Sequence, residues 1–265
     1  MVDNAQVPLP LTSVSDANSY SFGNWQYFFK KVFGGTNVKV KAKGFSNNQI
    51  AFATGYINSH ITQDLGDLAE HMRESNKGRV VRYISSMIAW NCALANELNF
   101  DLHKTLWDKY PGYCKYCGEP VDCADAWWTS KQTQTGKKPS HPLVDGKTAQ
   151  GEPQSLNGWV ELIDKLYGRK YQIGMSLSDI MYKLYEENAE VLEALNALKP
   201  NDAESFNEVT SEVADFLTWV FALMIKLHSY CYLDKTSLSK FLFDKFHEGC
   251  VRCKTICVCE PDWLK

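Results

Sequence analysis

The feature that most constrains this 265-residue chain is a set of short segments that occur twice in the same order. The matching pairs, each with its first residue, are WQYFFKKVFGG (Trp25) and WVELIDKLYGR (Trp159), HITQDLGDLAEHM (His60) and KLYEENAEVLEAL (Lys183), IAWNCALANEL (Ile88) and LTWVFALMIKL (Leu217), LWDKYPGYCKYC (Leu106) and LFDKFHEGCVRC (Leu242). Matches that recur in order indicate an internal repeat. We therefore predict two copies of one structural unit.

The matches also predict where the copies begin and end. The first copy covers residues 20–123 after an N-terminal extension, 1–19, and the second covers 156–265 with a cysteine-rich tail. Between them, residues 124–155 include TSKQTQTGKKPSHPLVDGKTAQGEPQ, which is polar and rich in Gly, Pro, Thr and Gln. This composition is typical of a linker or long loop.

Apolar residues recur at helical spacing, most clearly in the second copy, at Val213, Phe216, Leu217, Val220, Phe221 and Met224. The segment KPNDAESF supplies residues that end one helix and begin the next, and a further helix is expected over 237–247. Helices joined by such loops predict antiparallel bundles. The expected fold is all-α, with the two bundles packed about a pseudo-twofold axis like a fused homodimer.

Acidic residues gather on two of the expected helices. Glu186, Glu187 and Glu190 lie on one helix, while Glu212 and Asp215 lie three residues apart on the next. If these helices pack antiparallel, the carboxylates can face one pocket, where they repel one another unless cations neutralise them. Oxygen ligands of this kind suit Mg²⁺ or Mn²⁺. The alternative is a solvated acidic helix face.

These residues also carry a family resemblance. EENAE at 186–190 fits the pattern EExxE, EVAD at 212–215 fits ExxD, and a 21-residue spacer joins them. The lead-in KLYEENAE fits KLxEExxE. The second copy thus resembles the all-α nucleoside triphosphate pyrophosphohydrolases, the MazG and dimeric dUTPase superfamily, and the first copy resembles them only in outline.

The resemblance implies an enzyme that splits a (deoxy)nucleoside triphosphate into the monophosphate and pyrophosphate with Mg²⁺ or Mn²⁺. Glu187, Glu190, Glu212 and Asp215 would be the metal ligands. Glu186 would orient the attacking water or serve as a further ligand.

Positive and aromatic side chains are candidates for holding the nucleotide. Lys183, Lys240 and Lys245 could neutralise the triphosphate, although surface lysines are common. Trp219 lies one helical turn after Asp215 and could stack on a base, or it could pack in the core.

The first copy departs from the family at the metal positions. Asp64 and Asp67 replace the first pair of glutamates, while Tyr83 and Ser86 replace the ExxD carboxylates, with Arg82 alongside. We therefore expect one competent active site per chain. The first copy would be a structural partner, and it could lend groups to the pocket of the second.

Two CxxC motifs follow the repeated DK-aromatic segment, Cys114/Cys117 in the first copy and Cys250/Cys253 in the second. An odd total of nine cysteines with this spacing favours metal over disulfides. A pseudo-twofold axis could unite both pairs in one tetrahedral zinc site. Alternatively, the thiols are free, or each cluster binds its own ion with further cysteines, namely Cys123, Cys257 and Cys259.

Composition limits the partners. A net charge of −3 makes nucleic acid an unlikely general partner, and no apolar run is long enough to cross a membrane. The N-terminus shows no secretory signal, so a cytoplasmic protein is expected. Association of two chains into a homodimer stays an open alternative to the pseudo-dimer within one chain. The competing function is a non-catalytic, zinc-containing module that senses nucleotides or binds nucleic acid or protein.

Overall fold

The computed structural model describes residues 11–44, 49–114, 151–233 and 237–254. Within these ranges the chain forms helices and no strand, which confirms the all-α prediction. The first half contains α1 (Val14–Ser19), α2 (Phe22–Lys43), α3 (Gln49–Arg73), α4 (Lys77–Leu98) and α5 (Leu102–Lys109). The second contains α6 (Leu156–Arg169), the π-helical turn η2 (Lys170–Gly174), α7 (Leu177–Ala197), α8 (Ala203–Ser229) and α9 (Leu238–Phe246).

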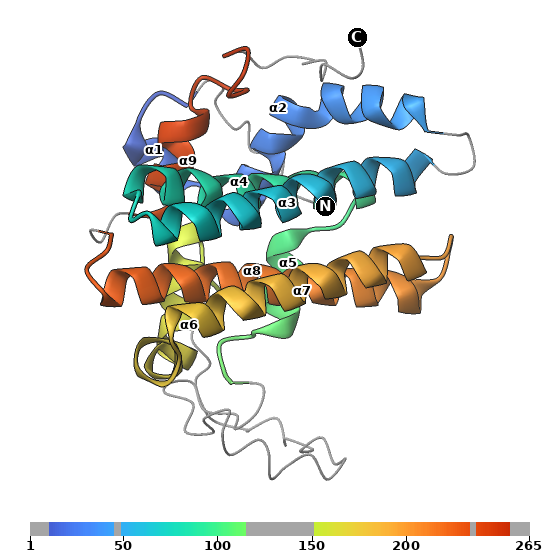
Figure 1. Ribbon diagram of the computed structural model, residues 1–265. Coiled ribbons are helices and arrows are strands. Elements are labelled where there is room, and N and C mark those ends of the chain that lie inside the picture. The colour runs from blue at the N-terminus through green and yellow to red at the C-terminus, as the bar shows by residue number, and fades with distance from the viewer. Residues whose placement is uncertain (1–10, 45–48, 115–150, 234–236, 255–265) are drawn as a thin grey trace, which may run out of the picture.

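Two antiparallel helix pairs form the centre of the molecule. Figure 1 shows α3 and α4 side by side above α7 and α8, with α3 packed against α7 between the pairs. Helix α2 packs on α3 and α4, and α6 packs on α8. No helix in the described ranges is long and apolar enough to span a membrane.

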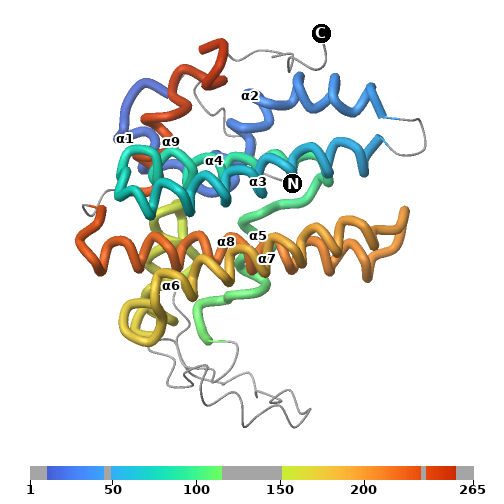
Figure 2. Tube along the Cα trace, in the orientation of Figure 1, coloured from blue at the N-terminus to red at the C-terminus, as the bar shows by residue number. Residues whose placement is uncertain are grey.

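The last helix of each half packs on the other half. Helix α5 contacts α8, and α9 contacts α4. The trace in Figure 2 shows the α5 segment passing from the α3–α4 layer to the α7–α8 layer. The pairings of the first half therefore have counterparts in the second, while the duplication itself stays a prediction.

Aromatic residues form the contacts through which α5 and α9 pack on the rest of the molecule. The ring of Trp25 on α2 lies 5.9 Å from that of Phe29, and Phe29 lies 5.0 Å from Phe246 on α9. In the second half, Trp159 on α6 lies 6.3 Å from Trp107 on α5. Trp25 and Trp159 are both fully buried. Burial of such large rings makes a major contribution to stability, so the two halves share one apolar core.

Polar contacts set how α7 lies against α3. Asn188 Nδ2 donates to Thr62 Oγ1 at 2.9 Å, and Tyr185 Oη donates to the backbone carbonyl of Leu65 at 3.1 Å. These part-buried hydrogen bonds favour one register over others, because a shift would break both of them. The faces of α7 are thereby fixed relative to the first half.

The predicted domain boundaries fall partly outside the described residues. Residues 115–150, which hold most of the predicted linker, are among those not described. The predicted N-terminal extension contains α1, which packs on α9. Ser237 Oγ donates to Asn18 Oδ1 at 2.7 Å at this contact.

Helix α7 begins with a capping box. Ser176 Oγ accepts from the backbone N–H of Asp179, and the Asp179 carboxylate accepts from the backbone N–H of Ser176. Two N–H groups that the helix cannot satisfy internally are thus bonded. This cap determines where α7 starts and so which of its side chains face α8.

We expect Ser176→Ala to lower the free energy of unfolding by about 1 kcal/mol, because it removes the cap. Urea denaturation followed by circular dichroism measures this change. Ser59→Ala is the matched control, since Ser59 is an exposed mid-helix serine bonded only to its own turn, at Tyr56. Equal midpoints for Ser176→Ala and the unmodified protein would contradict the expectation.

Candidate functional site

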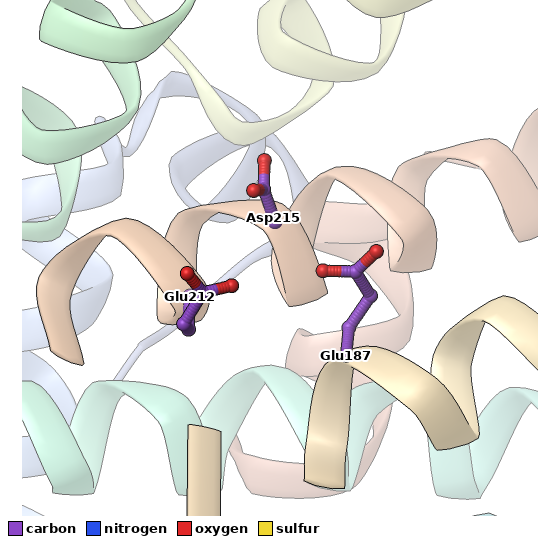
Figure 3. A group of neighbouring side chains, drawn as sticks. All are labelled: Glu187, Glu212 and Asp215. Carbon is purple, nitrogen blue, oxygen red and sulfur yellow. The ribbon is translucent and has the colours of Figure 1, made fainter. Parts of the chain in front are cut away.

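Three acidic side chains from two neighbouring helices converge between α7 and α8. Glu187 comes from α7, and Glu212 and Asp215 come from α8, as Figure 3 shows. One carboxylate oxygen of each lies within 4.8 Å of the others. Residues three apart share a helix face, so the antiparallel pair brings three of the four predicted metal ligands together.

The cluster makes ionisation of its members unfavourable. Glu187 is only 8% exposed, and burial, followed by the charges of Asp215 and Glu190, raises its pKa to about 7. The pKa of Glu212 is also raised, chiefly by burial, although the positive charge of Lys109 opposes the shift. Glu190, the fourth predicted ligand, is exposed but close enough for its charge to act on both glutamates. A cation would relieve this repulsion.

A lysine of the first half neutralises part of the cluster. Lys109, the last residue of α5, forms an ion pair with Asp215. Its Nζ also donates to the backbone carbonyl and Oγ of Ser211, at 2.9 and 2.7 Å. The next residue, Tyr110, donates its hydroxyl hydrogen to the other oxygen of Asp215. Burial and the charge of Asp215 hold the pKa of Tyr110 well above its usual range.

The sequence interpretation missed Lys109 and Tyr110. Both lie in the repeated DK-aromatic segment, LWDKY in the first half and LFDKF in the second. That repetition could have indicated a shared role for the lysine. What could not be read from it is that α5 packs on the opposite half.

Glu186 and Lys183 are not among the converging carboxylates, although the charge of Lys183 acts on Glu187 and opposes the rise of its pKa. They form an ion pair with each other on the exposed side of α7. The Glu186 side chain is 51% exposed. The structure therefore does not bring Glu186 to the position expected of a residue that orients water.

Lys240 and Lys245 also lie elsewhere than predicted. Helix α9 packs on α1, α4 and α6, which carries both lysines toward the first half. Lys240 forms an ion pair with Asp244 one turn along α9. Lys245 donates to Ser86 Oγ and, at 2.7 Å, to the backbone carbonyl of Arg82. Both lysines therefore lie beside α4 and not at the acidic cluster, where they were predicted to neutralise the triphosphate.

Aromatic rings lie next to the acidic cluster. Trp219, half-buried against the core, has its ring 5.5 Å from that of Tyr171. The ammonium of Lys170 lies 5.6 Å from the centre of the Trp219 ring. Tyr171 is also close enough to Tyr110 for the charges of their phenol groups to interact. The π-helical turn therefore adds an aromatic ring and a cation that the sequence interpretation did not include.

The predicted zinc ligands are divided between two places. Cys114 and Cys250 are buried and Cys253 is exposed, while Cys117 lies outside the described residues. In Figure 1 the segment after α5 ends below the α7–α8 pair, and the segment after α9 lies above it, near α2. This separation argues against one shared zinc site and leaves the two alternatives, one ion in each cysteine cluster or thiols without a metal. Zinc itself stays a prediction.

Comparisons with protein-family models, with curated proteins and with solved structures return no match. The resemblance to the all-α pyrophosphohydrolases thus depends on the motifs EExxE and ExxD alone. The convergence of Glu187, Glu212 and Asp215 is a separate observation, because it depends on how the helices pack and not on the sequence motifs.

In the metal-free protein, we expect the free energy of unfolding to fall as pH rises from about 5 to about 8. The folded state raises the pKa of Glu187 from 4.5 to about 7, so it holds this proton more tightly than the unfolded state does. The stabilisation is complete below the unfolded value and is lost as pH rises through the folded one. Glu187→Gln should therefore be more stable than the unmodified protein at pH 8 by about 1–2 kcal/mol after solvent screening.

Thermal melts in EDTA across this pH range measure the effect. Glu186→Gln is the matched control, since the exposed Glu186 should leave the pH dependence unchanged. A Glu187→Gln variant whose stability follows the same pH curve as the unmodified protein would contradict the assignment of a strained carboxylate.

Lys109→Met should strengthen Mn²⁺ binding by about fivefold, because it removes a cation that competes for Asp215. Mn²⁺ titration followed by electron paramagnetic resonance measures the dissociation constant. Lys245→Met is the control, because this lysine contacts α4 and not the acidic cluster. Weaker Mn²⁺ binding by Lys109→Met would show that the lysine supports the metal site and does not compete with it.

Proposed function

We propose that this chain is a Mg²⁺-dependent nucleoside triphosphate pyrophosphohydrolase that converts a (deoxy)nucleoside triphosphate into the monophosphate and pyrophosphate. The observation that carries the proposal is the convergence of Glu187, Glu212 and Asp215 within 4.8 Å. These residues occupy the positions of the EExxE and ExxD motifs that suggested the activity.

The donor set fits a hard divalent cation. It contains only carboxylate oxygens, which Mg²⁺ and Mn²⁺ prefer over nitrogen and sulfur ligands. Glu187, Glu212 and Asp215 would hold the metal, with Glu190 at the solvent side. When bound, the metal supplies charge neutralisation for the phosphates and lowers the pKa of a coordinated water.

Other residues of the chain would bind and orient the substrate. Lys109 offers its ammonium beside Asp215, where the phosphate oxygens of a nucleotide need positive charge. Trp219 and Tyr171 provide aromatic surface for a base, with the cation of Lys170 near the same rings. Hydrolysis would cleave the bond between the α and β phosphates: the oxygen of a water molecule bonds to one phosphorus, the bridging oxygen leaves with the electron pair of the broken bond, and the proton lost from the water passes to solvent.

We infer further that the chain contains two copies of one MazG-like unit and one such active site. The matching helix pairings support this view, because α5 on α8 corresponds to α9 on α4. Lys109 beside Asp215 likewise corresponds to Lys245 beside Ser86. The serine cannot replace a carboxylate as a metal ligand of comparable strength, so the first copy would lack catalysis.

The decisive experiment incubates the purified chain with each of the four common dNTPs and Mg²⁺ and measures pyrophosphate and monophosphate. Asp215→Asn should lower turnover by at least about a hundredfold, since it removes a metal ligand. Asp67→Asn, which removes a first-half carboxylate at the position matched to Glu190, should retain most activity. Release of orthophosphate and a diphosphate would contradict the assigned bond cleavage, and near-normal turnover by Asp215→Asn would contradict the assigned site.

A further inference from the structure

A cavity lies between the first half and the α9 segment, at the position that corresponds to the acidic cluster of the second half. Its volume is about 510 Å³, within the range of small-molecule sites. Asp64, Asp67, Tyr83 and Ser86 line it, and these are the residues that align with the four predicted metal ligands. The position that matches the acidic cluster is thus a cavity with two carboxylates, a phenol and a hydroxyl in place of four carboxylates.

Aromatic rings form one wall of this cavity. The rings of His60 and Trp90 stack at 4.4 Å, and those of Phe33 and Trp90 stack at 5.3 Å. Tyr56 meets His60 edge-on at 4.7 Å. All four residues are half-buried and line the cavity. These stacked and edge-on rings give the cavity a partly apolar aromatic wall that a base could contact.

Positive side chains also line the cavity, namely Arg79, Arg82, Lys245 and Arg252, and the charge of Arg252 acts on Tyr56. A second cavity of about 570 Å³ shares Arg82 and Lys245 with the first, and its lining also includes Lys77, Lys240 and Lys254. Together the two cavities have seven lysines and arginines but only three carboxylates, from Asp64, Asp67 and Asp244. This concentration of positive charge occurs in a chain whose net charge is −3.

Lys245 takes a central place in this arrangement. It donates to Ser86 Oγ and to the backbone carbonyl of Arg82, and its charge interacts with that of Asp64. Among the described residues, no third histidine, cysteine or acidic side chain completes a metal-binding group with Asp64 and Asp67. The lysine places an ammonium group here, whereas the second half presents carboxylates.

We propose that these adjoining cavities of the first half form a second nucleotide site, which binds a nucleoside polyphosphate without a metal ion and does not hydrolyse it. The base would lie against the wall of Trp90, His60 and Tyr56, and the phosphates would extend toward Arg82, Lys245 and the lysines of the second cavity. Binding at this site does not depend on the pyrophosphohydrolase activity proposed above.

The test uses the full chain in excess EDTA, where metal-dependent turnover cannot occur. Isothermal titration with α,β-imido deoxynucleoside triphosphates, one for each base, should show one saturable site for at least one of them. Arg82→Ala should weaken binding at least about tenfold, because it removes a charge between the two cavities. Arg73→Ala is the matched control, an exposed arginine outside both cavities. Asp215→Asn should leave this metal-free binding unchanged.

Several results would overturn the proposal. The first is absence of binding in EDTA. The second is loss of binding in Asp215→Asn together with retention in Arg82→Ala. The third is equal affinity for inorganic tripolyphosphate, because the aromatic wall would then contribute nothing to binding. Displacement by short single-stranded DNA at lower concentrations than by the nucleotide would assign the cavities to nucleic acid instead. Failure of pyrophosphate release in the earlier assay affects none of these readings.

Discussion

Each half of the chain buries its last helix against the other half, and both candidate sites depend on this exchange. The packing is apolar, through Phe246 of α9 against Phe29 and through Trp107 of α5 against Trp159. Because water-excluding contacts of this size are strong, the helices cannot separate without exposing much of the shared core. The same packing produces the ion pair at the acidic cluster, because α5 places Lys109 next to Asp215.

The two halves have corresponding helix pairings, but the side chains at the corresponding positions differ in charge. In the second half, carboxylates crowd together until burial and mutual repulsion raise the pKa of Glu187 to about 7. Beside the first half, burial lowers the pKa of the α9 residue Lys245 to about 8, although Asp64 opposes the shift. A site of the first kind favours cations, whereas one of the second kind favours anions. This difference in charge is the basis for proposing metal-dependent chemistry at one position and metal-free anion binding at the other.

Local sequence patterns predicted the helices and part of the acidic site well. Apolar spacing identified α8, and the predicted helix over 237–247 matches α9, Leu238–Phe246. The spacing of Glu212 and Asp215 placed them on one face, because three residues make nearly one helical turn. The same reasoning failed for Glu186, which the rotation of α7 leaves on the exposed side with Lys183.

What the sequence determined by itself was therefore local: helix positions, the shared face of Glu212 and Asp215, and the loss of carboxylates at Tyr83 and Ser86. Only the tertiary structure determined that α5 of the first half packs beside the acidic cluster and that α9 of the second half packs beside the cavity. Lysines in equivalent DK-aromatic segments, Lys109 and Lys245, end at Asp215 and Ser86 because α5 and α9 each pack across the molecule. Helical periodicity depends on neighbours within a few residues, whereas these contacts join residues more than a hundred positions apart and are selected by burial of the whole core.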